Sequence, residues 1–330
     1  MKREKSKLLV LFLFVCSVAC AFSTASAGIV AYWRFDDAGD ADIEQWGAVA
    51  AGNRLPDSDG QTVWRKAAHD HSGSGNHLTT WEYDDTWGGG VGWAGFNWSA
   101  DVASATVPQT GASNALSIQN AGGWPAAMTW SEQSLPSGTN IETFTPAAFT
   151  IEASFKADSL GGYQTIVGRD DRDVAAINGD LASLYFQVMP GNEVAFKFAD
   201  GDGYWHEVVS DPGAVTTGQW YDMVGVSDGS TMSLYLDNVL LEELDLTLSG
   251  STNTAMALGT ASGGDWESGT WSLGRGLYGG GHGDRWIGYI DEVRLSDTAL
   301  NPSEFLQVPE PATMLILGLG SLMLRKRRKS

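Results

Sequence analysis

Alternating apolar and polar residues recur along this chain, and the alternation predicts β-strands. The clearest run is Trp220–Leu246, whose apolar residues of one parity are Trp220, Val224, Val226, Met232, Leu234 and Leu236. Because strand side chains alternate between faces, each half of the run has one apolar face and one mostly polar face. Asp228-Gly229 and Asp237-Asn238 fit the central positions of tight turns, where φ is positive. We therefore predict three antiparallel strands joined by two hairpin turns.

Further strands are predicted wherever the alternation returns along the chain. They are Ile29–Phe35, Phe149–Phe155, Leu184–Val188, Val194–Phe198 and Trp286–Leu295. Trp33, Trp220 and Trp286 lie on such strands, and we expect them in the core. No helix-period stretch of useful length lies outside the two ends of the chain. Short strands with Gly-rich turns predict an all-β, two-sheet antiparallel sandwich. Helices are expected only as an N-terminal signal helix and a short C-terminal hydrophobic helix.

Both ends of the chain have the composition of targeting segments. Residues 1–27 combine a basic start, the apolar run Leu8–Val15 and a small-residue cleavage site at Ala27-Gly28, which predicts a signal peptide and export. At the other end, Pro309-Glu310-Pro311 precedes the apolar run Ala312–Leu324 and a basic terminus. This run is short for a permanent membrane span of about 20 residues. A simple C-terminal membrane anchor remains the alternative to a sorting signal.

Charge and cysteine content narrow the function classes. Cys16 and Cys20 both lie in the leader, so disulfides and thiolate metal sites are not expected in the exported chain. Residues 28–311 keep 11 basic and 39 acidic residues, a net charge of −28. Such a surface repels nucleic acid and attracts divalent cations. Nucleic-acid binding is therefore excluded.

Two resemblances follow from these motifs. The Pro-Glu-Pro tripeptide, hydrophobic run and basic terminus resemble the PEP-CTERM sorting signal, which implies processing by an exosortase after passage through the secretion machinery. The strand AYWRFDD (31–37), the loop DHSGSGN (70–76), the strand FTIEASF (149–155) and the closing strand WIGYIDEVRL (286–295) resemble LamG-like jelly-roll domains, relatives of the concanavalin A-like lectins and glucanases. We expect a jelly roll over 28–306 with an irregular insertion at 38–68, and a sorting segment over 307–330.

No catalytic constellation is apparent in the sequence. The laminarinase-type glucanases of this fold carry E-x-D-x-x-E, which places a nucleophile and an acid beside the sugar bond. Here Glu243 and Asp245 match, but Leu248 stands where the final glutamate is needed. Asp291 and Glu292 are adjacent, so we expect them to point to opposite faces of their strand. We predict that the protein is not an enzyme; a divergent glycoside hydrolase remains an alternative.

Calcium is the metal that the sequence favours. Asp70 and Asn76 offer carboxylate and amide oxygens in a Gly-containing loop, and Asp36 and Asp37 end the neighbouring strand. Oxygen ligands of this kind suit Ca²⁺, and the resemblance implies a calcium ion near the rim. The alternative is an Asx-type turn in which Asp70 and Asn76 only cap their own backbone.

Aromatic residues in loops are the candidate ligand contacts. Trp81, Trp87 and Trp93 recur through a Gly-rich stretch, and Tyr204-Trp205 follows in a second segment that we expect to be a loop. Exposed rings of this kind would stack on a polysaccharide ligand; alternatively, each ring anchors a long loop to the sandwich. The sequence thus predicts a carbohydrate-binding protein of the cell surface or extracellular matrix, held transiently at the inner membrane through residues 312–324. A purely structural component of the exopolysaccharide or biofilm matrix is the alternative.

Overall fold

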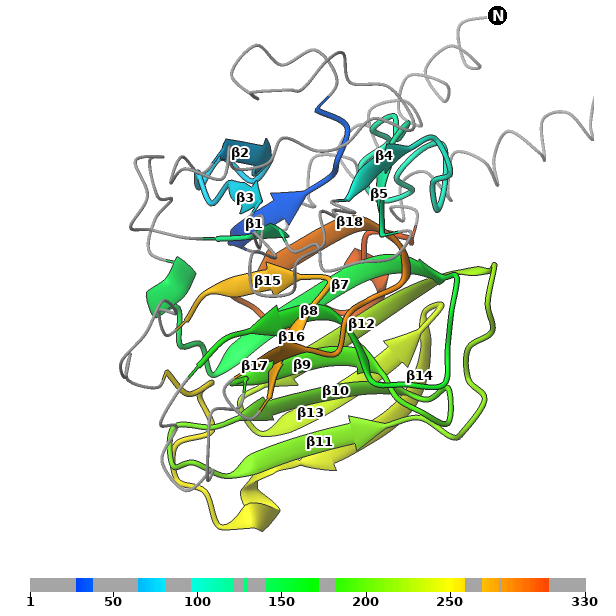
Figure 1. Cartoon of the computed structure of the whole chain (residues 1–330). Coiled ribbons are helices and arrows are strands. Elements are labelled where there is room, and N and C mark those ends of the chain that lie inside the picture. Colours follow the sequence, from blue (N-terminus) through cyan, green and yellow to red (C-terminus); the bar gives the residue numbers. More distant parts are fainter. Residues whose placement is uncertain are drawn as a thin grey trace, which may run out of the picture.

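Two antiparallel sheets stack face to face in the computed structural model of the chain (Figure 1). The structure describes residues 28–37, 65–80, 96–120, 127–129, 141–171, 182–258, 269–278 and 281–308. Within these ranges the strands form two eight-stranded sheets, which we call sheet A and sheet B, and one small hairpin. The predicted all-β sandwich is confirmed. The signal helix, the C-terminal hydrophobic helix and residues 38–64 of the expected insertion lie outside the described residues.

Sheet A pairs the first strand of the domain with the last one. Its order is β14 (Val239–Asp245), β13 (Thr231–Leu236), β12 (Trp220–Asp228), β7 (Ala148–Ala157), β18 (Gly288–Ser296), β5 (Ser117–Asn120) and β4 (Asn97–Ser99), with β1 (Ile29–Trp33) also paired to β18. The strands β12, β13 and β14 are the three strands predicted for Trp220–Leu246.

Sheet B lies opposite and is built mostly from the middle of the chain. Its order is β11 (Trp205–Val209), β10 (Val194–Ala199), β9 (Leu184–Val188), β8 (Gln164–Arg169), β15 (Trp271–Leu273), β6 (Ala127–Met128), β3 (Leu78–Thr80) and β2 (Arg65–Ala68). The small hairpin is β16 (Gly276–Tyr278) and β17 (Gly281–Gly283), and the 3₁₀ turns are η2 (Ile141–Thr143), η3 (Leu246–Ser249) and η4 (Pro302–Glu304). Because β2 occupies 65–68, the insertion predicted as irregular to residue 68 ends in a strand.

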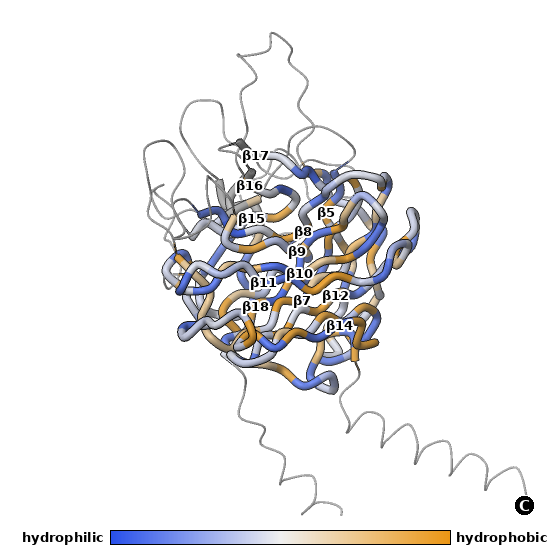
Figure 2. Tube along the Cα trace, turned by 90° about the horizontal axis from the view of Figure 1, so that it is seen from below, coloured by the Kyte–Doolittle hydropathy of each residue, from blue (hydrophilic) through white to orange (hydrophobic). Residues whose placement is uncertain are grey.

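The core fills the space between the sheets, and polar and apolar residues alternate along the strands that enclose it (Figure 2). Phe149, Ile151, Ala153 and Phe155 of β7 all face inward, as predicted. They meet Phe196 and Phe198 of β10, whose rings lie 5.9 and 5.4 Å from the Phe149 ring. Large aromatic side chains therefore bridge the two layers at their centre.

The prediction that Trp220 of β12 lies in the core is wrong. Val224 and Val226 point away from the core and pack under Leu300 and Phe305, whereas Tyr221 and Met223 point into it. Trp220 is half-buried on the same outer side, where its indole Nε1 donates to Asp101 Oδ1 at 2.8 Å. The alternation alone could not show which side of β12 faces the core, because the segment after β18 returns and covers the outside of sheet A.

The two hairpin turns differ from each other. Asp237 and Asn238 both have positive φ (49° and 63°), as the sequence predicts. In the other turn β12 runs through Asp228, and Gly229 alone has positive φ, at 87°. The central pair is therefore Gly229-Ser230, a turn with glycine first, and the Asp-Gly turn that we predicted is shifted by one residue.

Candidate functional site

A β-bulge in β18 places two carboxylates on the outer face of sheet A. Asp291 pairs with Ser154 and Arg294 with Glu152, so two residues of β18 stand opposite one residue of β7. Glu292 takes a φ of 47° to accommodate the extra residue. Because Ile290 and Val293 both enter the core, Asp291 and Glu292 both point outward. The expectation that these neighbours face opposite sides is thus wrong.

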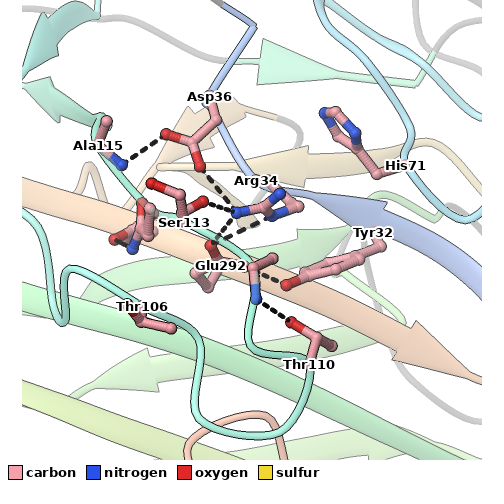
Figure 3. A network of polar contacts seen from close by, with 12 residues as sticks. Tyr32, Arg34, Asp36, His71, Thr106, Thr110, Ser113, Ala115 and Glu292 are labelled. Atoms are coloured by element: carbon pink, nitrogen blue, oxygen red, sulfur yellow. Dashed lines mark hydrogen bonds and ion pairs between the residues drawn. The ribbon is translucent and has the colours of Figure 1, made fainter.

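Glu292 is the centre of a polar network (Figure 3). The Tyr32 hydroxyl donates to its Oε2, and Arg34 Nε approaches its Oε1 at 3.4 Å. Arg34 also reaches Asp36 Oδ2 at 2.8 Å. Asp36 Oδ1 in turn accepts the backbone N–H groups of residues 115 and 116, at 2.7 and 3.0 Å. Burial raises the pKa of Glu292, while Tyr32 and Arg34 act in the opposite direction. The network ties β1, β18 and the 101–116 loop together.

The loop of Asp70 and Asn76 has the geometry of a backbone cap. Asp70 Oδ1 accepts from the backbone nitrogens of Tyr32 (2.9 Å) and Ser72 (2.8 Å), and its Oδ2 accepts from Ser72 Oγ (2.8 Å) and Asn76 N (2.9 Å). Asp37 accepts the His69 N–H at 3.1 Å and lies 2.8 Å from His71 Nε2. These contacts match the alternative of an Asx-type turn.

Three of the four predicted calcium ligands already accept hydrogen bonds, whereas Asn76 Oδ1 is buried without a partner. Asp36, Asp37 and Asp70 each accept hydrogen bonds from their own donors, and Asn76 Nδ2 donates to the carbonyl of Val30 at 2.7 Å. No group of three or more His, Cys, Asp or Glu residues in the described ranges could hold a metal ion. Calcium at these residues therefore stays a prediction, and no chemistry is assigned to it.

The segment Leu300–Val308, which we call the strap, closes the outside of sheet A. Phe305 packs edge-on against the Tyr235 ring at 5.2 Å, and Leu306 N donates to Glu152 Oε1 at 2.7 Å. Between the strap and sheet A lies a cavity of about 220 Å³. It is lined by Glu152, Ala153, Ser154, Asp222, Met223, Val224, Asp237, Asn238, Glu292 and residues 305–308. This volume is below the roughly 300–1,000 Å³ of most small-molecule pockets.

The outer face of sheet B carries an aromatic pair beside an ion pair. Trp205 starts β11 and is half-buried, with its ring 5.7 Å from that of Tyr185 at an angle of 72°. Lys197 Nζ lies 2.7 Å from Glu207 Oε1, and the register puts Tyr185, Lys197 and Glu207 in one row across three strands. Phe196 and Phe198 fill the opposite face of the same sheet. Trp205 is the partly exposed ring of this pair, because Tyr185 is buried against Ala182 and Leu277. Lys197 is also mostly buried, and Glu207 is the exposed member of the ion pair.

The segment Tyr204-Trp205 is not the loop that we predicted. Tyr204 ends the turn and is 43% exposed, with its N–H bonded to Asp200 Oδ1 at 2.8 Å, but Trp205 already belongs to β11. The next side chain, His206, is buried against Phe198 and lies 2.7 Å from Asp200 Oδ2. Trp81, Trp87 and Trp93 lie outside the described residues.

Comparison with protein families decides the identity of the domain. A family model described as the concanavalin A-like lectin/glucanases superfamily matches residues 129–305, which is more than half of the chain. The chain belongs to this superfamily. A second model, the PEP-CTERM protein-sorting motif, matches residues 307–329. A search of curated proteins finds no significant match.

Solved structures of several binding domains are similar to this superfamily member. Domain 4 of a GH43 extracellular arabinanase from Geobacillus stearothermophilus, solved with arabinotriose, is 13% identical, with 84% of this chain and 96% of that chain covered and a TM-score of 0.48. The CBM40 of a Ruminococcus gnavus IT-sialidase, bound to α2,3-sialyllactose, is 17% identical, covering 49% and 82% at a TM-score of 0.38. The ligand-binding domain of botulinum neurotoxin serotype D, in complex with N-acetylneuraminic acid, is 11% identical, covering 76% and 48% at 0.44.

The partial glucanase motif does not form a catalytic pair in this member of the superfamily. Glu243 is exposed on the edge strand β14, and Asp245 caps η3 by accepting from Thr247 N at 2.9 Å. Leu248, at the position of the missing glutamate, is 79% exposed. Asp245 thus has a structural role in the turn that ends β14.

The sorting motif begins inside the strap. Gln307 and Val308 are described and line the cavity, and Gln307 Nε2 donates to Ser154 Oγ at 3.1 Å. The motif marks the chain for export to the cell envelope or surface. Searching the described ranges for a helix long and apolar enough to cross a membrane finds none. Of the two predicted processing sites, Ala27 and Pro309-Glu310-Pro311 lie outside the described residues. Gly28 is the one processing residue that the structure describes.

Proposed function

We propose that this chain is an exported, exosortase-sorted surface protein whose jelly roll binds carbohydrate without hydrolysing it. The binding face is the outer side of sheet B around Trp205, whose ring Tyr185 supports from below. The observation that carries the proposal is a tryptophan on an outer sheet face, half-buried and edge-packed by a tyrosine, next to a Lys–Glu pair. The indole offers a flat surface for the apolar side of a sugar ring, and the ion pair offers donors and acceptors for hydroxyl groups.

Other parts of the molecule support a binding role over a catalytic one. Retaining or inverting hydrolysis needs two carboxyl groups about 5–10 Å apart on either side of a sugar. Glu243 is exposed on β14, Asp245 caps η3, and the carboxylates under the strap line a cavity of about 220 Å³. The superfamily contains lectins, and the similar arabinanase domain was solved with arabinotriose. Residues 312–324 would hold the chain at the inner membrane until the sorting signal is processed.

The test is glycan binding by the full chain purified in a mild detergent, on a polysaccharide array and by affinity electrophoresis. Trp205→Ala should weaken binding at least tenfold, or about 1.4 kcal/mol, because central aromatic contacts dominate such interfaces. Tyr163→Ala is the matched control, since Tyr163 is also an exposed aromatic residue but lies in the β7–β8 loop. If the Trp205→Ala variant binds as tightly as the wild type, the binding site lies elsewhere on the molecule. If the wild type binds no glycan, a structural role in the matrix is favoured.

A reducing-sugar assay on the same glycans separates binding from hydrolysis. The proposal expects no release of reducing ends over a day at any pH between 5 and 8. Release that Trp205→Ala abolishes would make the protein a divergent glycosidase. Repeating the array with EDTA tests the predicted calcium ion, because a calcium-assisted site loses its ligand when the ion is removed.

A further inference from the structure

A second pair of partly exposed aromatic rings lies on the outer face of sheet A. Trp220 starts β12 and Tyr289 is the second residue of β18, and their ring centroids lie 6.0 Å apart at an angle of 57°. Lys156 of β7 reaches both rings, with its Nζ 5.5 Å from the centroid of Trp220 and 3.9 Å from that of Tyr289. An ammonium group is attracted to the faces of such rings. The lysine therefore holds the two rings in place.

The strand register extends this cluster into a row across five strands, which we call the sheet A row. Trp220 pairs with Lys156, Lys156 with Tyr289, Tyr289 with Gln119, and Gln119 with Asn97. All five side chains point outward, because the adjacent residues of their strands enter the core; these are Tyr221, Phe155, Ile290, Ile118 and Trp98. Adjacent strands lie about 4.8 Å apart, so the sheet A row extends over about 19 Å.

Carboxylates border the sheet A row on two sides. Asp101, at the start of the 101–116 loop, accepts from Trp220 Nε1 at 2.8 Å and from the ammonium group of Lys156. Burial acts to raise the pKa of Asp101, but these two hydrogen bonds and the lysine charge lower it. Asp158, directly after β7, accepts from Gln119 Nε2 at 3.1 Å through its Oδ2. The charge of Lys156 is thus balanced, and oxygen acceptors lie beside the two rings.

We propose that the sheet A row is a second carbohydrate-binding site, and that its ligand is an uncharged polysaccharide chain lying across the strands. The apolar faces of its sugar rings stack on Trp220 and Tyr289. Its hydroxyl groups donate to the oxygens of Gln119, Asp101 and Asp158. An anionic glycan is disfavoured, because residues 28–311 carry a net charge of −28 and the cation of the row is already paired.

A site at the sheet A row gives the domain two binding faces, because Trp205 lies on the outer side of the opposite sheet. One protein molecule then links two polysaccharide chains, which requires both sites at once. This linking rests on the proposed function at Trp205, whereas binding at the sheet A row does not. We expect the row to be the weaker site, since its rings are tilted against each other and Lys156 between them is only 7% exposed.

The experiment measures glycan binding and cross-linking by the full chain in a mild detergent. The probes are soluble arabinan, xylan, mannan and β-glucan, with polygalacturonate as the anionic comparison. On the probe that retards the wild type most in affinity electrophoresis, Trp205→Ala should leave a weak residual binding. Adding Trp220→Ala to Trp205→Ala should reduce this residue at least tenfold. The wild type should raise the viscosity of the same polysaccharide solution, and either single variant should abolish the rise.

Matched variants separate binding from a structural role of the rings. Trp220→Phe keeps an aromatic ring and should retain the viscosity rise, and Tyr163→Ala, an exposed aromatic residue in a loop, should not change it. If Trp220→Ala does not fold, Tyr289→Ala replaces it in both assays. The proposal is overturned if Trp205→Ala alone removes all binding, or if Trp220→Ala lowers the thermal unfolding midpoint but leaves the residual binding unchanged.

The remaining outcomes distinguish this site from the one at Trp205. Loss of binding in Trp220→Ala, together with unchanged binding in Trp205→Ala, would refute the proposed function at Trp205 and support the sheet A row. Tighter binding to polygalacturonate than to every uncharged probe would overturn the assigned ligand class. A wild type that binds none of the polysaccharides would overturn both sites.

Discussion

Replacing Asp222 with asparagine should stabilise the protein at neutral pH and leave its stability unchanged near pH 4. Asp222 lies on β12 at the cavity under the strap, where its Oδ1 accepts from Ser154 Oγ at 2.5 Å. Burial raises the pKa of Asp222 to about 6; the Ser154 hydrogen bond opposes the rise, and Asp237 and Glu152 add to it. Glu292 lines the same cavity, so every titratable group that faces Asp222 here is acidic.

The sign follows from the two pKa values. An unfolded aspartate has a pKa of about 3.9, so the folded state binds more protons between pH 4 and pH 6. Stability is therefore lost as the pH rises through this window, and the loss is complete above pH 6. The full difference corresponds to about 3 kcal/mol. Because Asp222 is partly exposed, solvent screening reduces the expected effect to about 1–2 kcal/mol.

Denaturant unfolding at pH 4, 5, 6, 7 and 8, with calcium held constant, measures the effect. The free energy of unfolding of Asp222→Asn minus that of the wild type should be near zero at pH 4 and rise to about 1–2 kcal/mol at pH 7. Asp228→Asn is the control, since Asp228 ends the same strand in an exposed turn. A difference that is constant with pH, or that favours the wild type at pH 8, would refute the reasoning.

Two further substitutions test the packing. Gly225→Ala should cost about 1–3 kcal/mol by denaturant unfolding, because a Cβ there would lie 2.8 Å from the Phe196 ring, whereas Gly162→Ala, with no neighbouring atom within 4 Å, should be close to neutral. Glu152→Ala should cost about 3–5 kcal/mol because it leaves the buried Arg294 without its carboxylate. A Glu152→Leu/Arg294→Leu double variant should recover part of that loss, and equal losses for both variants would argue against the pairing.

Local alternation was sufficient to predict the strands and the core of β7, but it could not predict register. The bulge in β18 inserts one residue relative to β7, and only the pairing of Asp291 with Ser154 and of Arg294 with Glu152 reveals it. A rule of strict alternation therefore placed Asp291 and Glu292 on opposite faces. The sequence motif marked the right strand, yet the chemistry of its carboxylates depends on Asn114, which is far away along the chain.

The burial of β12 illustrates a related limit. Val224 and Val226 share their parity with Trp220, which was expected in the core, although Gly225 between them is what gives Phe196 room inside. The apolar outer side became visible only once Leu300 and Phe305 were seen to cover it. An apolar stripe identifies a covered face of a strand, but a tertiary contact decides whether a sheet or a returning segment covers it.

The two outer faces of the sandwich differ in how far they are covered. Within the described residues, the 101–116 loop and the strap cover much of the outside of sheet A, and a small acidic cavity lies under the strap. Its carboxylates are held by Arg34, Arg294 and hydrogen bonds, so this face stabilises the domain up to the first residues of the sorting motif. Sheet B keeps Trp205 and Glu207 partly or fully accessible on β11, its edge strand. The Trp205 variant therefore tests the outer face of sheet B, whereas the Asp222 and Glu152 variants test the packing of sheet A.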